Sequence, residues 1–177
     1  VDVSTSSRAT IGGMVGNNSA GGRSIRYGIM RDNVNSIDVI TSNSELARFG
    51  MMPEHTFGLD EVLPELLNLG INNRFEIERR FPKVLRRVGG YNLDALLEGT
   101  LSKRPGSNAA TSDINLAHLI VGSEGTLNYS SAIELKLSPL PAAKIMALCH
   151  FSSFYSAMDA AQHIVGVNPM TVELIDE

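Results

Sequence analysis

The stretch that most constrains this chain is Arg8 to Asn33, RATIGGMVGNNSAGGRSIRYGIMRDN, where glycine, asparagine and serine gather. Five glycines lie within eleven positions: Gly12, Gly13, Gly16, Gly21 and Gly22. Glycine lets the backbone take positive φ or approach a ligand closely, and short Asn and Ser side chains can bind the same ligand or cap a turn. Ordering such a segment costs entropy, which a bound group would offset. Composition alone leaves two readings open: a loop around a phosphate-bearing or planar cofactor, and a series of tight turns.

The overall composition bounds the class of protein. The 177 residues suit one domain, or one domain and part of another, and 43% hydrophobic residues suffice for a core. The net charge of −4 argues against a nucleic-acid partner. The sequence has no run of 18 apolar residues, so we expect no membrane span. The single cysteine, Cys149, excludes an intrachain disulfide and favours a cytoplasmic location. Because the first residue is Val1, we expect the chain to be a piece of a longer one.

Short apolar segments predict the strands. Residues 10–15 are expected to form a strand that opens into the glycine stretch. Residues 37–40 and 45–49 predict a β-hairpin, with Asn43 in the left-handed conformation that its tight turn requires. Three later strands are expected at 131–138, where apolar and polar residues alternate, at 145–151 and at 170–175.

Apolar residues at helical spacing predict a helix over 57–73. Asp60 is the expected N-cap or first-turn acid, Pro64 is restricted to the first turn, and Gly70 is expected to end the helix. Shorter helical turns are expected at 24–27 and 93–98. A further helix is expected to follow a serine cap, Ser152 or Ser153, and to run to about Val165 with its apolar face in a core.

Residues 74–104 are rich in basic side chains, and Pro82 should break or start any helix there. One reading is a lid or surface that attracts an anionic substrate, and the other is a solvated helical insertion. Arginine binds carboxylates in a fork, so four polar residues are candidates for a substrate carboxylate, with packing of the insertion as the alternative: Arg86, Arg87, Tyr91 and Asn92. Residues 103–112 are expected to form a loop.

A second distinctive stretch, GSEGTLN, spans Gly122 to Asn128. Successive N–H groups there could bind phosphate, or the stretch could be a plain turn between two strands. Neither glycine stretch has the dinucleotide G-x-G-x-x-G spacing or a Walker loop. The four histidines have no metal-like spacing, so no zinc site is expected. Among them, His118 lies in an apolar run and is read as a packed histidine rather than a cofactor ligand or attachment site.

Together, the two stretches resemble a known family. TIGGMVGNNSAG and RYGIMRDNV, followed by GSEGTLNYSSAIELKLSPLP, resemble the FAD-linked oxidases, the flavin-domain superfamily of vanillyl-alcohol oxidase and p-cresol methylhydroxylase (PCMH). Within it, the chain looks most like the group of glycolate oxidase subunit, D-lactate dehydrogenase and D-2-hydroxyglutarate dehydrogenase. FPKVLRRVGGYNLDALL and the final VELID resemble further segments of that group.

The resemblance implies an α+β fold. Residues 1–141 would be the C-terminal part of a PCMH-type FAD-binding domain, a mixed sheet with flanking helices, with a helical insertion at about 57–112. Residues 142–177 would begin a ferredoxin-like α+β substrate domain. The proline-punctuated LSPLP marks the expected boundary.

The resemblance also implies a set of FAD-binding residues in two groups. The first would lie along the flavin, ribityl chain and pyrophosphate: Thr10, Gly12, Gly13, Asn17, Asn18, Ser19, Gly21, Gly22, Tyr27 and Gly28. The second would form an FAD-facing turn: Gly122, Glu124, Gly125, Thr126 and Leu127. Asn128 stands where the family usually has glycine, and asparagine tolerates positive φ, so the turn is expected to survive.

The implied function is flavin-dependent oxidation of a 2-hydroxy acid of the D-lactate, glycolate or 2-hydroxyglutarate type. Electrons would pass to an acceptor outside this chain, such as an iron–sulfur domain or subunit, and a peripheral membrane partner is a further expectation. The family's first phosphate loop would precede residue 1 and its catalytic histidine would follow residue 177. We therefore name no catalytic or metal-binding residue, and expect these 177 residues alone to bind FAD weakly or not at all. The alternatives are a non-catalytic nucleotide-binding or assembly module and an inactive fragment.

Overall fold

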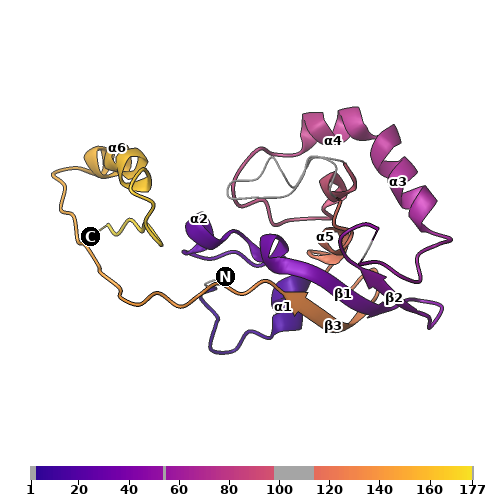
Figure 1. Cartoon of the computed structure of the whole chain (residues 1–177). Helices are drawn as coiled ribbons and strands as arrows, with labels where there is room; N and C mark the ends of the chain where they lie inside the picture. The colour runs from indigo at the N-terminus through magenta and orange to yellow at the C-terminus, as the bar shows by residue number, and fades with distance from the viewer. Residues whose placement is uncertain (1–2, 54, 98–113, 177) are drawn as a thin grey trace.

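The computed structural model describes residues 3–53, 55–97 and 114–176. The expected loop at 103–112 lies outside these ranges. The described residues combine short helices with one small antiparallel sheet, so the expected α+β class is confirmed at this level (Figure 1). Within the described part of the chain, no helix is long and apolar enough to cross a membrane.

The sheet has three strands, β1 (Val34–Ile40), β2 (Leu46–Phe49) and β3 (Tyr129–Leu135), in the order β2-β1-β3. Both neighbours run antiparallel to the central strand, and Ile37 pairs with Phe49 on one side and Ile133 on the other. The expected hairpin and the strand after the second glycine stretch are therefore confirmed. A long excursion of the chain separates β2 from β3, which nevertheless lie on either side of β1 (Figure 1).

The core lies on one face of this sheet. Ile37 and Val39 of β1 are completely buried, and α5 (Ala117–Ile120) packs against the strand with all four of its residues buried. Leu116 and Val121, which flank α5, are also fully buried. The buried run 116–121 leads directly into the second glycine stretch, so the core fixes where that stretch begins.

The turn of the β1–β2 hairpin differs from expectation by one residue. Ser44 takes the left-handed conformation, with φ +67°, and Asn43 does not. The Thr41 N–H donates to the Glu45 carbonyl at 2.9 Å and closes a loop of five residues. The Asn43 amide instead hydrogen-bonds to Glu45 Oε2 at 2.6 Å. The left-handed residue is therefore Ser44, which directly precedes Glu45 of the closing Thr41–Glu45 hydrogen bond.

The expectation of a strand at 10–15 is wrong, because this segment is the helix α1 (Ile11–Gly16). The Thr10 hydroxyl caps it by accepting a hydrogen bond from the Gly13 N–H at 3.1 Å. Ile11, Met14 and Val15 have the i, i+3, i+4 spacing of one helical face, and Val15 reaches the core. The helical turn α2 (Ser24–Tyr27) agrees with expectation, and η1 (Met30–Asn33) then leads into β1.

The segment between β2 and α5 contains α3 (Leu63–Asn72), α4 (Arg74–Arg80) and the 3-10 helix η2 (Leu93–Leu96). The first helix begins later than expected, with Val62 rather than Asp60 as N-cap, while Pro64 lies in the first turn as predicted. Gly70 does not end α3. It is buried within the helix against Leu96, where a side chain would not fit. Helix α4 ends before Pro82, as expected.

After β3 the chain is extended until α6 (Phe154–Val165), which stands apart from the sheet (Figure 1). Ser153 is its N-cap, as predicted, and accepts from the Ser156 N–H at 3.1 Å. The strands expected at 145–151 and 170–175 are wrong, since no strand occurs there and no described strand offers them a ladder. The apolar face of α6 also lacks the expected core contacts, because none of its residues is buried.

Candidate cofactor site

The two glycine stretches, which lie about a hundred residues apart in the sequence, meet in space. The Gly122 N–H donates to the Val15 carbonyl, and the Glu124 N–H donates to the Gly16 carbonyl, both at 2.9 Å. Carbonyl oxygens in the last turn of α1 thus accept hydrogen bonds from backbone N–H groups of the second stretch. We call the residues 10–28 and 122–127, joined in this way, the paired glycine turns.

The second stretch is held in a conformation that few residues tolerate. Gly122, Glu124 and Gly125 have φ of +86°, +53° and +74°. Left-handed backbone is free of strain at glycine, whereas at Glu124 it carries a steric cost. The Thr126 hydroxyl donates to the Ser123 carbonyl at 2.6 Å and closes the turn. Asn128 is not among the left-handed residues, so the turn forms without a glycine there.

Some glycines of the paired turns are required by the protein itself. A Cβ on Gly28, whose φ is +74°, would lie 2.6 Å from Asp32 Oδ2. A Cβ on Gly22 would lie 2.9 Å from both Thr171 Oγ1 and Glu173 Oε1, and one on Gly122 would lie 3.3 Å from Asn18 Cβ. Gly28 and Gly122 need glycine without any ligand because their φ is positive, whereas at Gly22 the neighbouring atoms belong to side chains that can move.

Gly12 and Gly125 are different, because a Cβ on either would meet no other described atom within 4 Å. Gly12 lies in the first of the paired glycine turns and Gly125 in the second, and in each the side of the backbone where a side chain would stand faces open space. At each of these two positions a ligand could approach the glycine without meeting a side chain. This local openness is compatible with a bound FAD.

The remaining predicted cofactor residues occupy varied surroundings. Asn17 and Ser19 are joined by a hydrogen bond from Ser19 Oγ to Asn17 Oδ1 at 2.5 Å, and the Gly21 N–H donates to Ser24 Oγ at 2.9 Å. Asn18 is completely buried. Exposed side chains at the second turn belong to Glu124, Thr126 and Leu127. FAD contacts of all these residues stay a prediction.

An apolar groove of about 320 Å³ runs beside α1. Ile11, Met14 and Tyr27 line one wall, and residues 135–141, which follow β3, line the other. Tyr27 is the sole residue of the predicted FAD set among the groove's lining residues. The groove thus adjoins the paired glycine turns without coinciding with the open space at Gly12 and Gly125.

A cluster of buried ion pairs joins Arg31, at the end of the opening glycine stretch, to Arg87 and Asp94. Arg31, only 2% exposed, donates from Nη1 and Nη2 to the two carboxylate oxygens of Asp94 at 2.8 and 2.9 Å. Arg87 donates from Nη2 to Asp94 Oδ1 at 2.5 Å, and its guanidinium lies over the Phe81 ring, 4.5 Å from the centroid. One carboxylate therefore holds two arginines from different parts of the chain.

Two asparagines connect this cluster to the paired glycine turns. Asn92 accepts a hydrogen bond from Arg87 Nη2 at 3.1 Å and donates to the Val121 carbonyl at 2.7 Å, immediately before Gly122. Asn18 accepts from the Arg31 N–H at 2.9 Å and donates to the Arg87 carbonyl at 3.5 Å. Both asparagines are at most 1% exposed. The arginines, asparagines and Asp94 form one closed network across three segments.

The charges of this cluster respond to burial and to each other. Burial alone would raise the pKa of Asp94, but the hydrogen bonds and positive charge of Arg31, with the charge of Arg87, hold it below its usual value. Burial lowers the pKa of Arg87, against the attraction of Asp94 and together with the repulsion of Arg31. Asp94 is therefore ionised at neutral pH.

The four candidates for a substrate carboxylate separate into two kinds. Arg87 and Asn92 belong to the buried network. Arg86 and Tyr91 are exposed, and each touches one of the paired glycine turns: Arg86 Nη2 lies 3.4 Å from the Gly22 carbonyl oxygen, and the Tyr91 hydroxyl lies 2.8 Å from Thr126 Oγ1. His118 is buried with Nε2 3.3 Å from the Val34 carbonyl oxygen, as a packed histidine would be.

Sequence reasoning missed Arg31 and Asp94. Arg31 lies within the opening glycine stretch, and Asp94 lies in YNLDALL, which carries part of the family resemblance. Asp94 lies between the apolar residues Leu93 and Ala95, whereas Arg31 lies between Met30 and Asp32. Nothing in the sequence indicated that these two residues, 63 positions apart, are partners.

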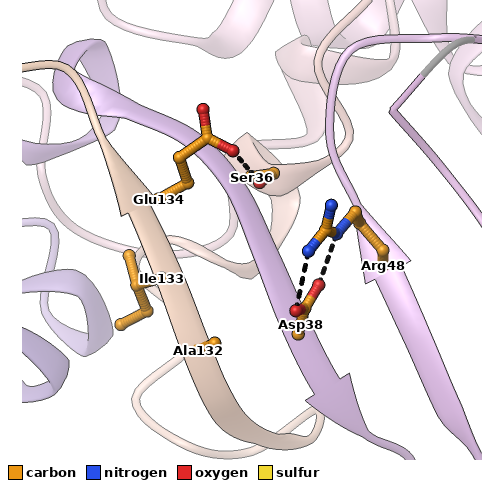
Figure 2. A pocket seen from close by; sticks show the side chains of 6 residues that line it. All are labelled: Ser36, Asp38, Arg48, Ala132, Ile133 and Glu134. Carbon is orange, nitrogen blue, oxygen red and sulfur yellow. Dashed lines mark hydrogen bonds and ion pairs between the residues drawn. The ribbon is translucent and has the colours of Figure 1, made fainter.

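A second polar cluster lies on the opposite face of the sheet from the core, at a hollow of about 210 Å³ (Figure 2). Arg48 donates from Nη2 to Asp38 Oδ2 at 2.8 Å, and Ser36 Oγ donates to Glu134 Oε2 at 3.1 Å. These side chains are paired across neighbouring strands, and the arrangement is that of a solvated sheet face. The described residues contain no group of three His, Cys, Asp or Glu side chains that could hold a metal ion.

Comparison with known proteins bears on the paired glycine turns. Residues 1–50 match the family described as FAD binding domain. The chain is 26% identical over 185 residues to D-2-hydroxyglutarate dehydrogenase of Pseudomonas putida, which covers 99% of this chain and 17% of that protein. It is 27% identical over 171 residues to mitochondrial D-lactate dehydrogenase [cytochrome] of Arabidopsis thaliana, and the match covers 96% of this chain and 21% of that protein. It is 25% identical over 178 residues to glycolate oxidase subunit GlcD of Bacillus subtilis, and the match covers 99% of this chain and 26% of that protein.

These relatives share the similarity over almost the whole of this chain, including both glycine turns. The chain spans only about a fifth of the length of the relatives, from 17% to 26% in these three. The match to an FAD-binding domain and the names of the relatives agree with the resemblance drawn from the two motifs. The chain is therefore similar to FAD-linked oxidases, and its residues 1–50 match an FAD-binding domain.

Proposed function

We propose that this chain supplies one wall of the FAD site in a flavin-dependent dehydrogenase or oxidase that acts on a 2-hydroxy acid. The observation that carries the proposal is the union of the two glycine turns, in which Gly122 and Glu124 donate to the end of α1. The substrate class is supported by the names of the relatives, which act on 2-hydroxyglutarate, D-lactate and glycolate.

The bare backbone at Gly12 and Gly125 would lie against the cofactor. The exposed Leu127 could cover a flat ring, and the Thr126 hydroxyl, already held by Ser123 and Tyr91, would offer an oriented polar contact. FAD supplies the redox chemistry when it is bound, and the protein binds and orients it. The residues of this chain would thus be binding residues, with no catalytic acid or base among them.

We also propose the finer domain division, in which residues 1–141 belong to a PCMH-type FAD-binding domain and residues 142–177 begin a ferredoxin-like substrate domain. The separation of α6 from the sheet supports a boundary near the prolines at 139 and 141 (Figure 1). The exposed apolar side chains of α6, such as Phe154 and Met158, are those of a helix whose packing partner is another element.

The electron acceptor and the location are proposals of the same kind. An iron–sulfur domain or subunit, or a peripheral membrane partner, would take the electrons. A cytoplasmic location is supported by the single cysteine alone.

The test is purification of the complete gene product that contains these residues, followed by flavin analysis. We expect FAD at one equivalent per chain and reduction of an artificial electron-accepting dye with D-2-hydroxyglutarate, D-lactate or glycolate. A bound nucleotide other than FAD would overturn the cofactor assignment. FAD without dye reduction by any 2-hydroxy acid would overturn the substrate class and leave the cofactor assignment intact.

A further inference from the structure

We propose that Asp94 is a positioning residue of the cofactor site, which fixes the two glycine turns relative to one another through Arg31 and Arg87. The inference rests on the proposed function, because it assumes that the paired glycine turns bind FAD. Asp94 itself lies in η2, outside both turns, and reaches them only through other side chains.

The first connection runs to the turn at Asn18. The Arg31 side chain is fixed by two hydrogen bonds to Asp94, and its backbone N–H donates to Asn18 Oδ1. Asn18 has a left-handed φ of +52°, which asparagine tolerates, and its buried side chain is fixed by hydrogen bonds with Arg31 and Arg87. A Cβ on Gly122 would lie 3.3 Å from Asn18 Cβ, so Asn18 is one of the residues where the two turns come close together.

The second connection runs to the turn at Gly122. Arg87 donates from one nitrogen, Nη2, to both Asp94 and Asn92. Asn92 in turn donates to the carbonyls of His118 and Val121, the residues that precede the turn. Since the amide of Asn92 is oriented by the hydrogen bond that it accepts from Arg87, loss of the Asp94 carboxylate would release this side of the network too.

The geometry explains why a carboxylate is needed at this position. A buried arginine pairs well only with a group that can accept two parallel hydrogen bonds, and Asp94 does this for Arg31 while also accepting from Arg87. An amide at position 94 would offer a single accepting oxygen and no charge. Arg31 and Arg87 would then repel each other at the junction of the three segments.

The chain offers a matched control. Asp38 and Arg48 also form a two-pronged pair between segments, but on the outer face of the sheet (Figure 2). Asp38→Asn therefore removes the same charge and the same kind of pair as Asp94→Asn. It should leave the cofactor site unchanged.

The experiment measures the Kd for FAD by quenching of flavin fluorescence, in the complete gene product stripped of flavin. We expect Asp94→Asn to weaken FAD binding about tenfold or more, with far-ultraviolet circular dichroism retained, and Asp38→Asn to bind like the unaltered protein. FAD binding unchanged in Asp94→Asn, or weakened equally in both variants, would overturn the proposal. An unaltered protein that binds no FAD would overturn the proposed function instead.

A second variant guards against misfolding. Arg87→Lys keeps the positive charge beside Asp94 but loses the planar guanidinium whose Nη2 reaches both Asp94 and Asn92, so we expect it to fold and to bind FAD more weakly. Unchanged FAD binding in a folded Arg87→Lys protein would contradict the proposal. Failure of both Asp94→Asn and Arg87→Lys to fold would assign the network to folding alone and overturn a role in positioning.

Discussion

Arg31 and Asp94 form a two-pronged ion pair, at 2.8 and 2.9 Å, that joins the opening glycine stretch to η2 across 63 positions of the chain. The arginine is almost completely buried, whereas the aspartate keeps partial contact with solvent. This pair is the centre of the side-chain network that contacts both of the paired glycine turns. It is therefore the first place where stability and cofactor binding can be tested separately.

Removing the charge of Asp94 should destabilise the fold strongly. Asp94→Asn would leave the buried Arg31 guanidinium without its counter-charge, which costs about 3 kcal/mol or more of the free energy of unfolding. The matched change Asp38→Asn, in a pair with more than a quarter of each side chain exposed, should cost less than about 1 kcal/mol. Urea denaturation of both variants measures the difference, and equal losses would contradict the account of a buried pair.

The same pair predicts a pH dependence. Because the pKa of Asp94 is held below its usual 3.8 in the folded protein, the unfolded chain binds more protons than the folded one in the window below that value. The stabilisation from Asp94 is therefore complete above the ordinary pKa and is lost as the pH falls through the folded one. Urea unfolding at a series of pH values should show a steeper acid loss for the unaltered protein than for Asp94→Asn. Identical slopes would show that Asp94 is not held in its charged form.

Gly70 tests the packing of α3 on η2. A Cβ at this position would lie 2.7 Å from Leu96 Cβ and 2.9 Å from the Leu96 carbonyl oxygen, so the two helices would have to separate. Alanine improves helix propensity by about 1 kcal/mol, but overpacking costs about 1 to 3 kcal/mol. We expect Gly70→Ala to lower the melting temperature. Gly89→Ala, where a Cβ would meet no other described atom within 4 Å, should leave it nearly unchanged. A stabilised Gly70→Ala protein would refute this packing.

The local pattern of the sequence predicted much of the sheet. Alternation and turn residues placed the hairpin and the strand after GSEGTLN, because these signals depend on neighbours along the chain. The segment at 10–15 was misread as a strand, since its glycines concealed the i, i+3, i+4 spacing of Ile11, Met14 and Val15 and the capping hydroxyl of Thr10. The predicted strand at 145–151 fails for another reason: its apolar residues satisfy the local pattern, but no described strand pairs with them.

The candidate site was predictable only in part. The glycine stretches could be recognised from their residues, and their contact through Val15 and Gly16 fits the expectation that both face one ligand. The network behind them was not predictable, because Asp94 and Arg31 are brought together by the folding of a long intervening segment. A lone Arg or Asp in a sequence carries no signal of its partner, and only the three-dimensional arrangement shows that a single carboxylate serves both arginines.

A substitution at Gly12 can distinguish an effect on FAD binding from an effect on the stability of the fold. It lies in the first turn of α1, where a Cβ would meet no other described atom within 4 Å. Alanine there should leave the stability of the flavin-free protein unchanged, or raise it by up to about 1 kcal/mol. If FAD lies against this backbone, the added methyl group should weaken FAD binding about tenfold, which equals about 1.4 kcal/mol. Unaltered FAD binding in Gly12→Ala would show that FAD does not lie against the backbone of Gly12.

The most direct test of the central claim is a calorimetric titration of FAD into the flavin-free complete gene product. The account predicts saturable binding at one FAD per chain, because the paired glycine turns present bare backbone at Gly12 and Gly125 to one shared ligand. The absence of saturable FAD binding by a correctly folded protein would contradict it.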